Sequence, residues 1–177
     1  MRFIKYLNLL LIIGVVVLLS LSLEGCTNDQ PTPNQPKSQF SQEEEKRMAL
    51  YTTVMRAAFQ QENGGNRFIA VKLDSLEGIS SEAKAKVLEQ LQDLSPQVYD
   101  YELVKQDPAK FKLEEGGQLQ AAKDGTVLSV KLDSYSDNRA IIDGVSWFGN
   151  LGAVFPSYEA TYKNGQWHLK LISMAIS

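Results

Sequence analysis

The chain has 177 residues, a formal net charge of −3 at pH 7 and a single cysteine, Cys26. This length suits one folded domain with a sizeable core. The mild acidity excludes the basic footprint of a nucleic-acid-binding protein, and one cysteine excludes an internal disulfide bond.

The N-terminal segment, residues 1–25, has the composition of a secretory signal. Arg2 and Lys5 precede a short apolar run, and Gly25 stands directly before Cys26. A charged start, an apolar middle and a small residue before the processing point are typical of a signal peptide. The apolar run is shorter than the roughly 20 residues that a spanning helix needs. The alternative is an uncleaved signal anchor in which Cys26 is an incidental thiol.

The sequence Leu23-Glu24-Gly25-Cys26 resembles the lipobox of bacterial lipoproteins. The resemblance implies that Cys26 receives diacylglycerol on its sulfur and that a signal peptidase cuts before it. Cys26 would then be the N-terminus of a protein anchored in the cell membrane and facing outward. Glu24 departs from the family pattern, in which this position holds a small or apolar residue.

Residues 26–40 are predicted to be the lipidated cysteine and a disordered tether. The stretch 27–38 contains three prolines and no large apolar residue, so it cannot bury enough surface to fold. Proline favours an extended chain, so this tether would hold the domain at residues 41–177 away from the bilayer.

The domain is predicted to begin with a long helix over residues 41–63. Ser41 and Glu44 form a capping box in front of apolar residues at helical spacing. Gly64 and Gly65 end this helix.

A buried strand, a second helix and an alternating strand follow. Residues 67–73 are largely apolar on both faces, which is typical of a covered strand. A helix that starts at Ser80 or Ser81 ends before Pro96. Residues 98–104 alternate between apolar and acidic side chains and therefore predict a strand.

The remainder of the chain has the pattern of antiparallel strands joined by tight turns. Asp124-Gly125 and Asn164-Gly165 are both two-residue hairpin signals. The predicted strands are residues 111–113, 118–122, 126–132, 140–147, 154–163 and 166–176.

This order of elements indicates an α+β fold with two helices packed on a curved antiparallel sheet. By element order, the domain resembles the NTF2-like and cystatin-like families of exported domains, in which a bent sheet wraps a long helix. The stretch 144–174 also resembles uncharacterised small lipoproteins of Gram-positive bacteria. These resemblances imply a fold and a location, and they bring no established activity.

Aromatic residues near the last strands are candidates for a ligand pocket. Several glycines beside them permit sharp bends, so rings at the mouth of a bent sheet would line a small apolar pocket. The alternative is a bulged sheet corner with an aromatic core beneath it. The candidate residues are Trp147, Phe148, Phe155, Tyr158 and His168.

No residue is assigned to catalysis, to a metal or to a cofactor. His168 is the sole histidine, and no serine lies in a Gly-x-Ser-x-Gly setting. Asp133, Asp137, Asn138 and Asp143 bring oxygen atoms to one turn, but their spacing differs from a calcium-binding EF-hand. A polar turn is the favoured interpretation.

Together these features predict a membrane-anchored extracytoplasmic lipoprotein of the binding type. Its partner would be another envelope protein or a small apolar ligand, and not nucleic acid. One alternative is an accessory subunit of a membrane transporter or envelope complex. The other is a small hydrolase or isomerase, which requires a buried polar group facing a cavity near Tyr158, Glu159 or His168.

Overall fold

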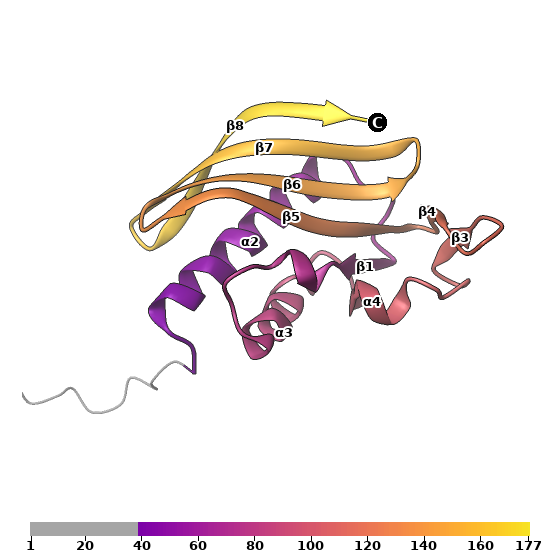
Figure 1. Cartoon of the computed structure of the whole chain (residues 1–177), viewed down its shortest axis with the longest axis horizontal. Helices are drawn as coiled ribbons and strands as arrows, with labels where there is room; N and C mark the ends of the chain where they lie inside the picture. The colour runs from indigo at the N-terminus through magenta and orange to yellow at the C-terminus, as the bar shows by residue number, and fades with distance from the viewer. Residues whose placement is uncertain (1–38) are drawn as a thin grey trace, which may run out of the picture. The chain divides into compact units, whose positions relative to one another are not determined.

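The computed structural model describes residues 39–177, which fold as three α-helices and an open sheet of eight strands (Figure 1). The predicted signal peptide, Cys26 and most of the predicted tether lie outside the described residues. The helices are α2 (Gln42–Gln61), α3 (Ser81–Gln90) and α4 (Tyr101–Val104), with a short 3₁₀ turn η1 (Leu73–Ser75). The strands are β1 (Phe68–Val71), β2 (Val98–Asp100), β3 (Phe111–Leu113), β4 (Leu119–Ala122), β5 (Gly125–Ser136), β6 (Arg139–Gly149), β7 (Gly152–Lys163) and β8 (Gln166–Ile176).

Helix α2 begins at the predicted capping box. The Ser41 hydroxyl accepts the backbone N–H of Glu44 at 3.2 Å, and the Glu44 carboxylate accepts the backbone N–H of Ser41 at 3.3 Å. The same carboxylate also accepts the backbone N–H of Ser80 at 3.0 Å, directly before α3. Hydrogen bonds from Ser80 and Ser41 hold the pKa of Glu44 below its ordinary value. One side chain therefore satisfies donors at the starts of two helices.

The sheet is antiparallel on one side and parallel on the other. Strands β5, β6, β7 and β8 form the predicted antiparallel meander. Strands β1 and β2 add to it in parallel, with Ile69 between Thr126 and Val98. The prediction of a purely antiparallel sheet is therefore wrong at this edge. Parallel neighbours need a long crossover, and the segment that contains α3 supplies it between β1 and β2.

Of the two predicted hairpins, only the one at Asn164-Gly165 is confirmed. These residues have φ angles of 53° and 80°, and β7 and β8 pair on either side of them. Asp124 also has a positive φ of 59°, but β4 pairs with β3 and β6 and not with β5. Strand β1 takes the place beside β5, and the backbone N–H of Arg67 donates to the Asp124 carbonyl at 2.9 Å.

The predicted strand over residues 98–104 is wrong beyond its first three residues. Strand β2 ends at Asp100, whose side chain accepts the backbone N–H of Glu102 at 3.0 Å. Asp100 is therefore the N-cap of a helix, and the acidic Glu102 in the first turn also stabilises the helix start. The chain therefore turns into the short helix α4 at Tyr101.

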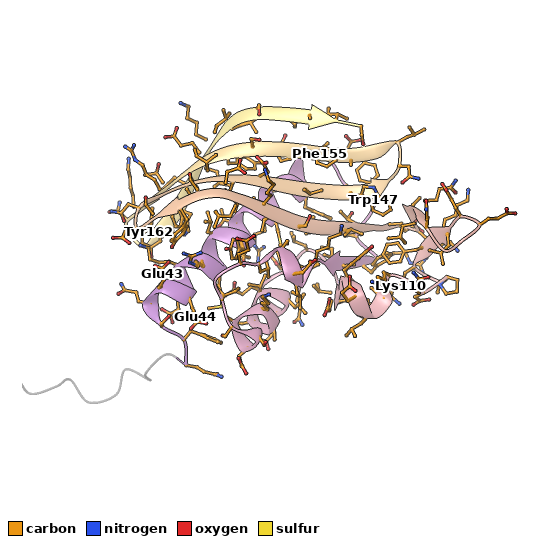
Figure 2. All side chains as sticks on the ribbon, in the orientation of Figure 1. Glu43, Glu44, Lys110, Trp147, Phe155 and Tyr162 are labelled. Atoms are coloured by element: carbon orange, nitrogen blue, oxygen red, sulfur yellow. The ribbon has the colours of Figure 1, made fainter. Side chains whose placement is uncertain are left out.

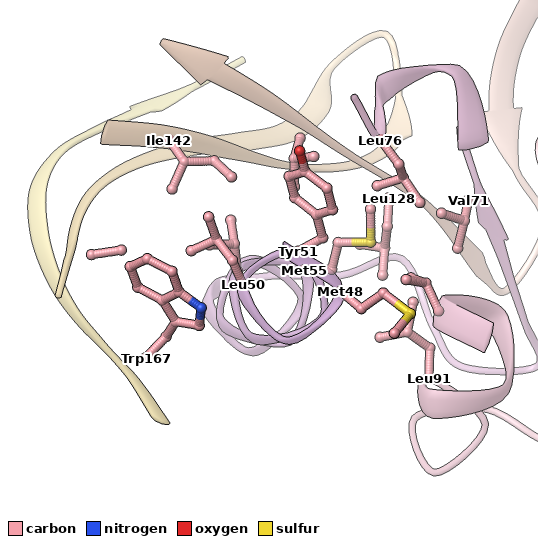
Figure 3. Close-up of a cluster of buried hydrophobic side chains, with 14 of the residues drawn as sticks. Met48, Leu50, Tyr51, Met55, Val71, Leu76, Leu91, Leu128, Ile142 and Trp167 are labelled. Carbon is pink, nitrogen blue, oxygen red and sulfur yellow. The ribbon is translucent and has the colours of Figure 1, made fainter. Parts of the chain in front are cut away.

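The main core lies between α2 and one face of the sheet, which we call the inner face. The sheet curves around this helix (Figures 1 and 3), and Leu50 on α2 is fully buried with Leu128 and Ile142 of the sheet. Gly144 allows the close approach, because a Cβ atom there would lie 3.0 Å from the Cβ of Ala58 on α2.

A smaller apolar cluster lies on the opposite face of the sheet, which we call the outer face. Strand β1 is buried along its whole length, as predicted, because Ile69 and Val71 face the main core while Phe68 and Ala70 face the other way. This second cluster joins α4 and β3 to the sheet. Its buried members are Phe68, Ala70, Val104, Phe111 and Val127.

Candidate functional site

The five aromatic and histidine candidates lie on both faces of the sheet and do not form one site. Trp147 and Phe155 are on the outer face, in the half of the sheet nearer to the β3–β4 hairpin (Figure 2). Tyr158 is in the main core. Phe148 packs over Gly152 and lines a separate shallow hollow. His168 is on the outer face, opposite Thr161 in the register of β7 and β8.

Tyr158 is part of the main core and does not line the hollow that holds Trp147 and Phe155. Its side chain is buried on the inner face, and its hydroxyl finds no hydrogen-bond partner among the described residues. Burial raises the pKa of this hydroxyl. For Tyr158, the alternative of an aromatic core beneath the sheet therefore describes the structure.

Trp147 and Phe155 line a hollow of about 440 Å³ on the outer face, which we call the outer-face groove. This volume lies within the range of small-molecule sites. The residues that line the groove are Lys72, Tyr101, Leu119, Val127, Ser129, Val145, Trp147, Asn150 and Phe155.

The floor of the groove follows from the pairing of β5, β6 and β7. Val127 lies opposite Trp147, and Ser129 lies opposite Val145. On the next strand, Trp147 faces Ala153. Ala153 is buried beside the indole ring.

One wall of the groove comes from α4 and β4, which rest on the second cluster. Tyr101 is the first residue of α4, and its ring centroid lies 6.4 Å from that of the buried Phe111. Burial raises the pKa of Tyr101. Leu119 from β4 also lines the groove. The helix that the sequence did not predict therefore supplies an aromatic wall of the site.

The groove has one cation and no acidic residue among its lining side chains. The ammonium group of Lys72 lies 5.1 Å from the centroid of the Tyr101 ring, a distance at which a cation is attracted to the ring face. Ser129 and Asn150 add neutral polar groups, and the Asn150 amide donates to Glu114 at 3.3 Å. Aromatic rings together with a few polar groups are the usual lining of a small-molecule site.

The rest of the outer face becomes more polar with distance from the groove. In the next row of residues, Ser157 donates to the Asp143 carboxylate, and Lys131 lies opposite Asp143. Farther along, Glu159 lies opposite Lys170. The sheet thus presents an apolar, aromatic end and a polar end on the same face.

The metal and hydrolase alternatives find no assembled site in the described part of the chain. No group of three or more histidine, cysteine or acidic side chains within residues 39–177 is placed to hold a metal ion. Asp133 instead pairs with Lys131 at 2.8 Å. Tyr158 and His168, proposed for a hydrolase, lie on opposite faces of the sheet.

No protein-family model, curated protein or solved structure matches this chain. Among the described residues, no helix has both the length and the apolar character needed to cross a bilayer.

Proposed function

We propose that this protein is a membrane-anchored extracytoplasmic lipoprotein whose domain binds a small apolar ligand in the outer-face groove. The observation that carries the binding proposal is a set of aromatic rings left partly exposed together. Phe155 is 38% exposed, and Trp147 and Tyr101 beside it are half-buried. Folding buries most large rings, so rings gathered in an open hollow mark an interaction site.

We also propose that the domain has the NTF2-like or cystatin-like arrangement. The support is a long helix, α2, that a curved sheet wraps (Figure 3). The parallel edge formed by β1 and β2 is an addition to the antiparallel meander.

The binding proposal is tested with N-phenyl-1-naphthylamine, a neutral dye that fluoresces in apolar surroundings. Residues 38–177 are one compact unit that contains both apolar clusters, so a fragment of these residues is used, and thermal unfolding checks its fold before titration. We expect saturable binding of one dye per chain. Phe155→Ala should weaken the affinity about tenfold, which corresponds to about 1.4 kcal/mol of lost contact.

The matched control is Leu103→Ala. Leu103 is an apolar side chain that is 83% exposed on α4 and lies outside the groove, so the affinity should stay unchanged. Fluorescence that never saturates, or equal affinities for wild type and Phe155→Ala, would reject the groove as a binding site.

A second candidate function, an accessory subunit of an envelope complex, is favoured by the free edge of the sheet. Among the described residues, strand β8 pairs only with β7, so its other edge offers backbone groups that no described strand pairs. Such an edge is a template for an extended segment of a partner protein. Four large apolar side chains of β8 are also exposed: Leu171, Ile172, Met174 and Ile176.

Photo-crosslinking in cells tests this candidate. A crosslinker at position 172 should give an adduct with an envelope protein that peptide mass analysis identifies. The same crosslinker at position 103 is the control, because Leu103 is exposed on α4 and far from β8 in the chain. An adduct with a second copy of this chain would indicate self-association instead, and no adduct would remove the candidate.

A further inference from the structure

The position of Lys72 at the groove is fixed by its backbone. Lys72 directly follows β1, and its backbone N–H donates to the carbonyl of Leu128 on β5 at 3.0 Å. Its own carbonyl accepts the Ser75 hydroxyl at 2.6 Å and the Ser75 backbone N–H at 3.1 Å. The side chain therefore leaves a rigid point of the fold and reaches the groove wall at Tyr101.

Within residues 39–177, the Lys72 ammonium forms no ion pair with a carboxylate. Asp74 lies close enough to influence the ionisation of Tyr101, but it does not line the groove. Five other lysines do pair with an acid: Lys86, Lys105, Lys110, Lys131 and Lys170.

We propose that the groove selects an apolar ligand that carries one anionic group, which the Lys72 ammonium binds. The apolar body of this ligand lies against Trp147 and Phe155, and the Ser129 hydroxyl offers a further hydrogen bond. The inference rests on the proposed binding function and specifies its ligand class. The Lys72 residue is half-buried and its ammonium lies over the Tyr101 ring. A cation in such surroundings interacts more strongly with an anion than a cation in bulk water does, because nearby protein replaces part of the solvent.

Two dyes that share one apolar skeleton and differ in charge separate the contribution of charge to the binding affinity from that of apolar contact. N-phenyl-1-naphthylamine is neutral, and 1-anilinonaphthalene-8-sulfonate is the same skeleton with one sulfonate. For the fragment of residues 38–177, we expect the sulfonate to bind more tightly than the neutral dye. Lys72→Met, which keeps a side chain of similar length, should lower the affinity for the sulfonate about tenfold relative to the affinity for the neutral dye.

Two further variants distinguish a specific contact from net charge. Lys72→Arg keeps the cation and should retain the preference for the sulfonate. Lys112→Met removes one positive charge from an exposed residue outside the groove, so it should leave both affinities unchanged. The wild-type preference should also weaken as sodium chloride is raised. The full chain in neutral phosphatidylcholine vesicles, compared with Lys72→Met at equal lipid, repeats the test on the intact protein.

The outcomes separate this inference from the binding function. If neither dye binds saturably, both the groove function and its ligand class are rejected. If both dyes bind and Lys72→Met leaves the ratio of their affinities unchanged, the groove function survives and the anionic ligand class is rejected. A loss of the same size in Lys112→Met would also reject a direct contact with Lys72.

Discussion

Replacing Phe111 with alanine should lower the free energy of unfolding by about 3–5 kcal/mol, the range observed for large buried rings. Phe111 is 1% exposed in the second cluster. Its ring packs edge to face against Phe68, with 5.3 Å between the ring centroids, and more distantly against Tyr101. Alanine would leave a cavity that the backbone of β3 cannot close without moving.

The loss should appear in a single unfolding transition of the whole domain. Strand β1 belongs to both apolar clusters, because Phe68 and Ala70 face one of them while Ile69 and Val71 face the other. A cavity beside Phe68 therefore weakens the strand on which α2 and α3 also depend. The same change removes support from Tyr101, so dye binding in the outer-face groove should weaken as well.

Denaturant-induced unfolding of wild type and Phe111→Ala measures this loss. Leu103→Ala is the control on the neighbouring α4, because a side chain that is 83% exposed should change stability by no more than about 0.5 kcal/mol. Two separate transitions would show that α4, β3 and β4 unfold independently of the main core. A loss below about 1 kcal/mol would show that the ring is poorly packed.

Features set by neighbouring residues could be predicted from the sequence. The capping box at Ser41 and Glu44 is local chemistry, since both partners lie within one helical turn. The turn at Asn164-Gly165 is also local, because these residue types tolerate positive φ. Both predictions are confirmed, because the capping hydrogen bonds and the positive φ angles involve only residues within a few positions of each other.

Features set by distant residues could not be predicted in the same way. Asp124-Gly125 has residue types that suit the same kind of turn. The strand before it, β4, nevertheless pairs with β3, and β1 pairs with β5 where the hairpin would have put β4. That choice depends on burying β1 on both faces, which brings together residues from far apart in the sequence. Asp100 is a residue type that caps helices, and it caps α4 in the structure. The alternation of apolar and acidic residues over 98–104 nevertheless predicted a strand.

The candidate site shows the same division. Two-residue alternation along a strand already separates Trp147 from Phe148, and Phe155 from Tyr158, so the aromatic candidates could have been sorted by face. Lys72, more than seventy positions before Trp147 in the numbering, carries no signal of its own. Only the parallel pairing of β1 with β5 brings it to the groove.

Replacing Cys26 with serine should move the protein from the membrane to the soluble fraction. Cys26 lies outside the described residues, and the prediction follows from its lipobox resemblance. Each buried methylene of an acyl chain contributes about 0.8 kcal/mol, so a protein held by diacylglycerol on Cys26 would lose most of its membrane affinity with this residue. Membrane fractionation and mass analysis of the N-terminal peptide, with and without globomycin, measure the change.

Glu24→Ala is the matched variant, because it restores the small residue that the lipobox pattern has at this position. It should increase the fraction of processed, lipidated protein, whereas Cys26→Ser should abolish lipidation. The folded domain should be unaffected in both variants, so dye binding and thermal unfolding of the released protein should match wild type. Retention of Cys26→Ser in the membrane without lipid would instead identify the N-terminal apolar run as an uncleaved anchor.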